Sequence, residues 1–198
     1  QARTENSPLA LLIINLDCFE EINNTLGHDN GDLILQQMAI RLQGITGEPN
    51  RVARLGGDVF AVLLKSTDAE GASKRAEEII GAIKESIAIA DLFIEVSASI
   101  GISLFPGHGA DADTLIRRAE IAMYVAKRIE SILCIYSPKY DQYSQKKTCP
   151  YGRTSPGHRA RPDVPPVSAE DRPKNRQNKR CKGLMPMAAS QIGCHTPK

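Results

Sequence analysis

The chain has 198 residues, of which 41% are hydrophobic and 24% charged, and its formal net charge is +2. This length and apolar content suffice for one globular core plus additional segments. No apolar run approaches the roughly 20 residues of a membrane-spanning helix, and no secretory signal is visible, so a soluble cytoplasmic domain without membrane contact is expected. The five cysteines lack a regular spacing, which argues against a disulfide framework.

The small net charge hides an uneven distribution along the chain. Residues 1–145 contain 13 Lys and Arg against 20 Asp and Glu, whereas residues 146–198 contain 12 against 3. Apolar periodicity also ends near Tyr140, so the remainder cannot bury enough apolar surface to offset chain entropy. A basic nucleic-acid-binding tail is the less favoured interpretation, and a non-native or out-of-frame extension is a further hypothesis. The predicted organisation is a frayed N-terminus at 1–7, a folded domain at 8–140 and a disordered basic tail at 141–198.

The first predicted element is a strand. Pro8 to Leu16 is a continuous apolar run of strand length, typical of a central strand that is covered on both faces. It ends in Asn15-Leu16-Asp17, which places polar groups at the strand's C-terminal end, where ligand sites of α/β proteins tend to lie. Phe19 to Leu26 then predicts a short helix that ends at Gly27.

Three longer helices are predicted from caps and apolar periodicity. Asp32 is expected to cap a helix that ends at Gly44, with apolar residues at i, i+3, i+4 and i+7. Asp68 begins the next helix, which carries a continuous apolar stripe. Asp113 begins the last helix, which runs to Arg128.

The remaining predicted elements are strands. Gly56 and Gly57 lie between two apolar runs and predict a tight β-hairpin, since glycine adopts positive φ without steric cost. Leu92 to Phe105 alternates β-branched and polar residues, and Ile132 to Tyr136 closes the sheet. The order β-α-α-β-β-α-β-α-β predicts an α+β fold, with helices flanking a mainly antiparallel central sheet.

The hairpin admits two interpretations. Gly-Gly-Asp is a common turn, and a plain hairpin explains it without any function. A bare glycine backbone also lets a bulky ligand approach the main chain, and Asp58 places a carboxylate beside that space. The second interpretation is a nucleotide cradle with an acid at its edge.

Several separate motifs, in one order, decide between these interpretations. They cover roughly residues 8 to 137, and together they resemble the GGDEF family, the diguanylate cyclases that condense two GTP into cyclic di-GMP with release of pyrophosphate. The motifs are Asn15-Leu16-Asp17-Cys18-Phe19, Ile22-Asn23-Asn24-Thr25-Leu26-Gly27-His28, Gly31-Asp32, Arg54-Leu55-Gly56-Gly57-Asp58-Val59-Phe60, Ser99-Ile100-Gly101-Ile102-Ser103 and Arg118-Ala119-Glu120-Ile121-Ala122-Met123-Tyr124-Val125-Ala126-Lys127.

The resemblance implies the family's palm-like fold and a Mg²⁺ site. In the family, a strand-end Asp, the next backbone carbonyl and the hairpin acid supply oxygen ligands, the kind that hard cations prefer. These positions are Asn15, Leu16 and Asp58 here. Asp58 is therefore the candidate catalytic acid. Because Asn15 has lost the negative charge, a weakened metal site is expected.

Other positions also depart from the family pattern. The family's second hairpin acid is Val59, its phosphate-binding lysine aligns with Glu20, and its Gly-Arg near the last helix reads Glu130-Ser131. Glu20 reverses the charge that would face a triphosphate. Lys127 remains as a phosphate contact.

The guanine-binding positions match the family. Asn23 and Asp32 occupy them, and an amide with a carboxylate can read the guanine edge, although a helix-end residue and an N-cap explain them equally well. Gly56 and Gly57 complete the predicted substrate-binding set with Lys127. The family's inhibitory R-x-x-D product site reads Gly47-Glu48-Pro49-Asn50, so product inhibition there is not expected.

The departures from the family pattern at the metal-binding and phosphate-binding positions predict a degenerate GGDEF domain. It would bind guanine nucleotide weakly, have little or no cyclase activity, and act in regulation. The resemblance also implies a homodimer, because the family joins two half-sites that each hold one GTP, and a neighbouring phosphodiesterase domain is an expected partner. The alternative is an active diguanylate cyclase in which Asn15 and Asp58 still hold metal.

Overall fold

The computed structural model describes residues 7–89, 92–143 and 185–186. Nearly all of the predicted tail at 141–198 therefore lies outside the described residues. Within the described residues, no helix combines the length and apolarity needed to cross a bilayer. The elements in chain order are β1 (Leu9–Leu16), α2 (Phe19–Leu26), α3 (His28–Thr46), β2 (Arg51–Gly56), β3 (Val59–Lys65), α4 (Ala69–Lys84), β4 (Ile87–Ile89), β5 (Leu92–Ile94), β6 (Ala98–Phe105), α5 (Ala112–Arg128), β7 (Leu133–Ile135), the 3-10 helix η1 (Pro138–Tyr143) and β8 (Met185–Pro186).

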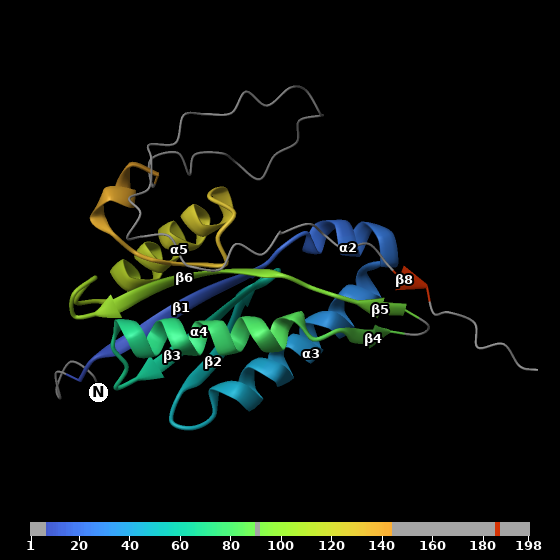
Figure 1. Ribbon diagram of the computed structural model, residues 1–198, viewed down its shortest axis with the longest axis horizontal. Coiled ribbons are helices and arrows are strands. Elements are labelled where there is room, and N and C mark those ends of the chain that lie inside the picture. The colour runs from blue at the N-terminus through green and yellow to red at the C-terminus, as the bar shows by residue number, and fades with distance from the viewer. Residues whose placement is uncertain (1–6, 90–91, 144–184, 187–198) are drawn as a thin grey trace, which may run out of the picture.

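The main sheet has five strands in the order β2-β3-β1-β6-β7 (Figure 1). Its pairs are antiparallel except β6 with β7, which is parallel. A small second sheet contains β4, β5 and β8. The predicted α+β fold with a mainly antiparallel sheet is thus confirmed, and β1 is its central strand, as its unbroken apolar run predicts.

Alternating side chains of β1 pack against different helices. Leu12 and Ile14 belong to the main core, which also contains the apolar stripes of α3 and α4, whereas Leu11 and Ile13 pack in a cluster with Leu115 of α5. Figure 1 shows α5 on one side of the sheet and α3 and α4 on the other. Because side chains alternate along a strand, Asn15 is directed to the same face as Leu11 and Ile13, the α5 face.

Helix α5 lies very close to β6 at Gly101. A Cβ atom built on Gly101 would lie 2.0 Å from the carbonyl oxygen of Ala119 and 2.2 Å from the amide nitrogen of Met123. Backbone therefore contacts backbone here, and only glycine fits without a shift of the helix. This contact sets the distance between α5 and the sheet.

On the opposite face, Arg41 joins α3 to the end of α4. Its guanidinium donates hydrogen bonds to the carbonyl oxygens of Ala82 (3.1 Å), Ser86 (3.0 Å) and Glu85. These carbonyls lie at the C-terminal end of α4, where the helix dipole favours a cation. The contact holds α3, which carries Asp32, in place against the sheet.

Two predicted limits of α3 are wrong. Asp32 does not cap the helix, because α3 already begins at His28 after a connection of one residue, Gly27, with φ of 85°. Gly44 does not end the helix either. The helix continues to Thr46, and Gly47, whose φ is 59°, is its C-cap, whereas Gly44 lies inside the helix without a positive φ.

Other limits differ more modestly. The predicted strand from Leu92 to Phe105 is interrupted at residues 95–97, because β5 pairs with β4 in the second sheet whereas β6 pairs with β1. Asp111, not Asp113, caps α5, and its side chain accepts a hydrogen bond from the Thr114 amide at 2.8 Å. The helix of Phe19–Leu26 and the cap at Asp68 are as predicted.

His108, between β6 and α5, predicts a pH dependence of stability. Its Nδ1 accepts a hydrogen bond from the Leu104 amide (3.1 Å), and its ring contacts Tyr136 edge-on at 5.3 Å. Burial, and secondarily Arg118, lowers the pKa of His108 below 6.5. The unfolded chain therefore binds the proton more readily, so this contribution to stability is full above the unfolded pKa, declines as the pH falls, and is lost at the folded pKa.

The measurement is urea unfolding between about pH 7.5 and about pH 5. We expect the wild-type chain to lose more unfolding free energy over this range than His108→Gln, which keeps a hydrogen-bond acceptor but does not titrate. His28→Gln is the matched control, because His28 is exposed on α3. An identical decline for His108→Gln and wild type would contradict the assignment.

Candidate functional site

Asn15 and Lys127 meet at the C-terminal end of β1. Asn15 is buried, with 9% of its surface exposed, and its Oδ1 accepts a hydrogen bond from Nζ of Lys127 in the last turn of α5. The contact follows from the alternation of β1, which directs Asn15 to the α5 face, and from the close packing of α5 at Gly101. Residues 112 positions apart in sequence thus share one site.

Asp17 is a member of this cluster that the sequence analysis did not include among the site residues. Its Oδ1 lies 3.7 Å from Nζ of Lys127 and accepts a hydrogen bond from the hydroxyl of Ser99 (2.9 Å), while its Oδ2 accepts from Ser97 (3.0 Å). The Asp17 amide also donates to the Ser97 carbonyl at 2.7 Å. The sequence could have indicated Asp17, because it follows Asn15 by two residues and such residues lie on the same face of a strand.

The hairpin brings Asp58 to the same strand end. The amide of Leu16 donates to the carbonyl oxygen of Asp58 at 3.1 Å, so the turn between β2 and β3 lies directly beside the end of β1. Gly56 and Gly57 have φ of 152° and 51°, and a Cβ on either would meet no atom within 4 Å. The space above them is open, and the positive φ values explain why glycine is needed. Arg54 steadies the turn through a 2.9 Å hydrogen bond from Nε to the Gly57 carbonyl.

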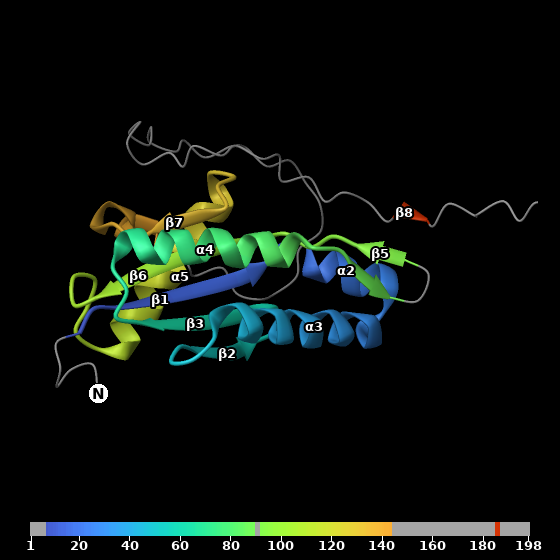
Figure 2. The same ribbon diagram turned by 60° about the horizontal axis from the view of Figure 1, so that its bottom comes forward.

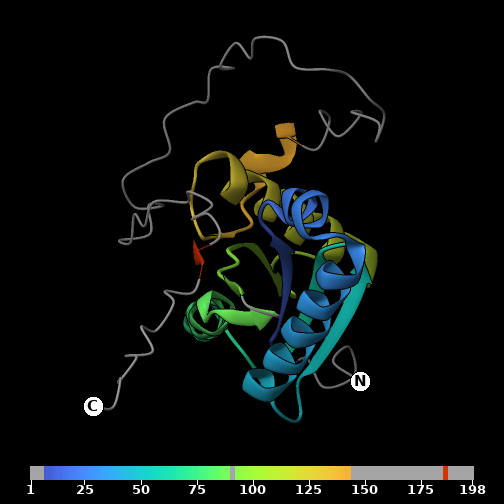
Figure 3. The same ribbon diagram turned by 90° about the vertical axis from the view of Figure 1, so that its right-hand side faces the viewer.

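The predicted guanine-binding pair lies at the junction of α2 and α3. The Oδ1 atom of Asn23 would be 1.8 Å from a Cβ on Gly31, so the amide lies directly over this buried glycine of α3. Asp32 follows Gly31 and is exposed. Figure 2 shows α2 at the end of β1 to which the arrowhead points, and Figure 3 views the protein from that end. Glu20 is exposed in the first turn of α2.

The predicted metal-binding positions, Asn15, Leu16 and Asp58, lie together at the end of β1. Asn15 supplies a neutral amide oxygen, and Lys127 already donates to that oxygen. Among the residues described, no three His, Cys, Asp or Glu side chains are grouped as metal ligands usually are. A hard divalent cation prefers several anionic oxygens and is repelled by an adjacent ammonium group.

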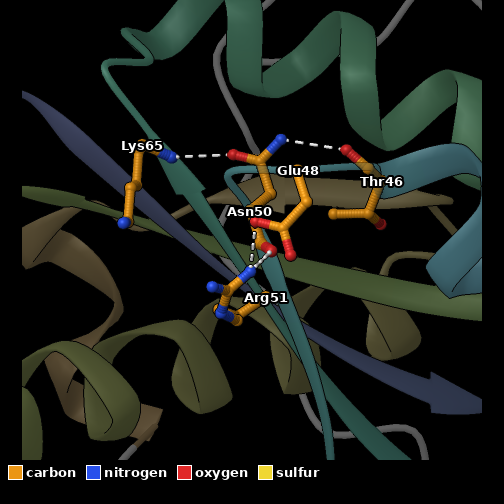
Figure 4. Close-up of polar contacts among 5 residues, drawn as sticks. All are labelled: Thr46, Glu48, Asn50, Arg51 and Lys65. Carbon is orange, nitrogen blue, oxygen red and sulfur yellow. Dashed lines mark hydrogen bonds and ion pairs between the residues drawn. The ribbon is translucent and has the colours of Figure 1, made fainter.

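Side chains in the segment that precedes the hairpin make hydrogen bonds and an ion pair with neighbouring residues (Figure 4). Nδ2 of Asn50 donates to the Thr46 carbonyl at 2.9 Å, and Oδ1 of Asn50 accepts from the Lys65 amide at 3.0 Å. Asn50 thus joins the end of α3 to the end of β3. Glu48 pairs with Arg51 at 2.7 Å, which lowers the pKa of Glu48. The amide of Asn50 thus holds the segment between α3 and β2 in place.

Comparison with known proteins identifies the family. Residues 1–131 match the family described as "Diguanylate cyclase, GGDEF domain". The chain belongs to the GGDEF family. Diguanylate cyclase TpbB of Pseudomonas aeruginosa is 42% identical over 130 residues, which are 64% of this chain and 30% of TpbB. Cyclic di-GMP phosphodiesterase PdeR of Escherichia coli is 30% identical over 139 residues, or 70% of this chain and 21% of PdeR. This GGDEF chain thus matches less than a third of the length of either relative.

Solved structures support the same assignment. The GGDEF domain of TpbB aligns with a TM-score of 0.69 at 37% identity, covering 73% of this chain and 86% of that domain. The active GGEEF domain of a diguanylate cyclase from Vibrio cholerae aligns with a TM-score of 0.63 at 30% identity, covering 69% and 87%. The fold is therefore that of a GGDEF domain.

Proposed function

We propose that this chain is a degenerate GGDEF domain of cyclic di-GMP signalling, which binds guanine nucleotide weakly and has little or no cyclase activity. The observation that carries the proposal is the hydrogen bond from Lys127 to Asn15 at the end of β1. The position that should supply an anionic metal ligand supplies a neutral amide, and a cation already contacts it. Losing one carboxylate at close range in a buried site costs several kcal/mol of cation binding, or orders of magnitude in rate.

The phosphate side supports the same proposal. Glu20 and Glu21 place two carboxylates in the first turn of α2, where the family resemblance implies a phosphate-binding lysine. Like charges repel a triphosphate instead of anchoring it. Asn23 and Asp32, in contrast, keep the side chains that can hydrogen-bond guanine. We therefore expect the chain to bind the guanine base but to catalyse cyclic di-GMP formation poorly.

A domain that binds nucleotide but has little cyclase activity is expected to have a regulatory role. Relatives named as cyclic di-GMP phosphodiesterases, PdeR and NbdA, contain a segment similar to this chain that forms 21% and 16% of their length. We infer that this domain regulates a neighbouring phosphodiesterase domain and that it acts in the cytoplasm as a homodimer, with GTP as its ligand and Mg²⁺ contributing weakly.

The second candidate is an active diguanylate cyclase. It is favoured by the 42% identity to TpbB, which is named as a diguanylate cyclase. In that case Asp58, with Asn15 and the Leu16 carbonyl, would hold the Mg²⁺ that activates the 3′-hydroxyl and neutralises phosphate charge.

Incubation of the purified chain with GTP and Mg²⁺ separates the two candidates. We expect cyclic di-GMP formation, followed by liquid chromatography, to be at least about 100-fold slower than for the active Vibrio cholerae GGEEF domain under the same conditions. Binding of mant-GTP, a fluorescent GTP derivative, should still be detectable. Turnover equal to that of the Vibrio domain would favour the active cyclase and refute degeneracy.

A further inference from the structure

Lys127 contributes more to the end of β1 than one hydrogen bond. Its ammonium group donates to Oδ1 of Asn15 and lies 3.7 Å from Oδ1 of Asp17. It therefore contacts Asn15, one of the predicted cation ligands, and the carboxylate of the neighbouring Asp17. An ammonium is a compact point charge with three donors and no acceptor, so it can satisfy oxygen atoms from several directions.

Within the group formed by Asn15, Asp17 and Lys127, one carboxylate lies beside one ammonium. Asp17 is largely buried, with 13% of its side chain exposed, and its carboxylate accepts from the hydroxyls of Ser97 and Ser99. One buried carboxylate beside one ammonium is neutral overall, and a buried charge is stable when it is paired in this way. A divalent ion at the same place would have to displace Lys127 and bind a neutral amide.

Lys127 also faces outward. Its side chain is 37% exposed, in contrast to the buried Asn15 that it contacts. Part of the Lys127 side chain is thus open to solvent at the end of β1, the strand end beside which the Gly56-Gly57 turn lies through the hydrogen bond between Leu16 and Asp58. An anionic group bound there would meet a positive charge that the fold itself supplies.

We propose that the Lys127 ammonium takes the place of a divalent cation at the end of β1, so that this chain binds nucleotide phosphates without metal. The nucleotide part of the proposal rests on the proposed function. The cation part rests only on the contacts of Lys127 with Asn15 and Asp17.

The first experiment tests the cation part without nucleotide. Binding of Mn²⁺ is followed by electron paramagnetic resonance for the wild-type chain and for Asn15→Asp, which restores a carboxylate and keeps the side-chain size. We expect Asn15→Asp to bind Mn²⁺ at least about tenfold more tightly than wild type, because the added charge lets the ion displace Lys127. Equal Mn²⁺ binding by the two chains, at any level, would overturn the proposal.

The second experiment tests the nucleotide part. Binding of mant-GTP is measured in Mg²⁺ and in EDTA for wild type, Lys127→Gln and the control Lys74→Gln, whose lysine is exposed on α4. The wild-type and control dissociation constants should differ by less than about threefold between Mg²⁺ and EDTA, whereas Lys127→Gln should bind at least about tenfold more weakly in both.

The outcomes distinguish the two proposals. Binding by wild type that requires Mg²⁺, or equal binding by Lys127→Gln and Lys74→Gln, would overturn the inference about Lys127. Absence of mant-GTP binding by wild type in every condition would refute the proposed function, and the Mn²⁺ comparison would still decide the role of Lys127. Circular dichroism confirms that each variant is folded.

Discussion

Gly101→Val is expected to lower the free energy of unfolding by about 3 kcal/mol, the upper end of the cost of overpacking a core. A Cβ at this position would lie 2.0 Å and 2.2 Å from backbone atoms of Ala119 and Met123, which cannot rotate away as a side chain can. The helix α5 must therefore move away from β6. Urea unfolding followed by circular dichroism measures the effect.

The matched control is Gly81→Ala on α4, where an added Cβ would meet no atom within 4 Å. That variant should be slightly more stable than wild type, by about 0.5 to 1 kcal/mol, because alanine favours a helix interior over glycine. A displaced α5 also moves Lys127 away from Asn15, so Gly101→Val should lose mant-GTP binding even where it remains folded. A valine variant as stable as wild type would show that α5 does not pack as closely as described.

The second large effect is expected from Asn15→Asp combined with Glu20→Lys. The first change restores an anionic oxygen at the end of β1, and the second reverses the charge at the start of α2. If these two positions account for the loss of chemistry, cyclic di-GMP synthesis should rise by about 100-fold or more over wild type. Product formation from GTP and Mg²⁺ is measured by liquid chromatography.

Asn15→Asp combined with Glu70→Lys is the control, because Glu70 is exposed in the first turn of α4 and the change in net charge is the same. The control should gain less than the double variant with Glu20→Lys. Should neither double variant form more cyclic di-GMP than wild type, the proposed loss of activity would have further causes, and the Glu130-Ser131 segment after α5 would be the next position to restore.

Much of the fold could be predicted from local pattern. The apolar run of β1 indicated a strand covered on both faces, and the spacing of Ala72, Ala76 and Ile79 indicated the buried face of α4, because burial imposes a period on the sequence. The hairpin was evident from two adjacent glycines. The family motifs, in their order, were sufficient to predict the GGDEF fold, which the comparisons confirm.

Other features could not be predicted from local pattern. Asp32 has the side chain of a cap, yet α3 begins a turn earlier because Gly27 alone connects it to α2. The strand from Leu92 is divided because its two parts pair with different partners, β4 and β1. Pairing partners are chosen by the tertiary structure, and no local periodicity encodes them.

The sequence by itself determined the residue types of the site: an amide at position 15, an acid in the hairpin and a lysine near the end of the last long helix. Only the tertiary structure decided that Lys127 meets Asn15 and Asp17. That contact requires both the alternation of β1, which directs Asn15 toward α5, and the absence of a side chain at Gly101, which lets α5 approach the sheet. Sequence specifies which groups are available, and close packing determines which of them come within bonding distance.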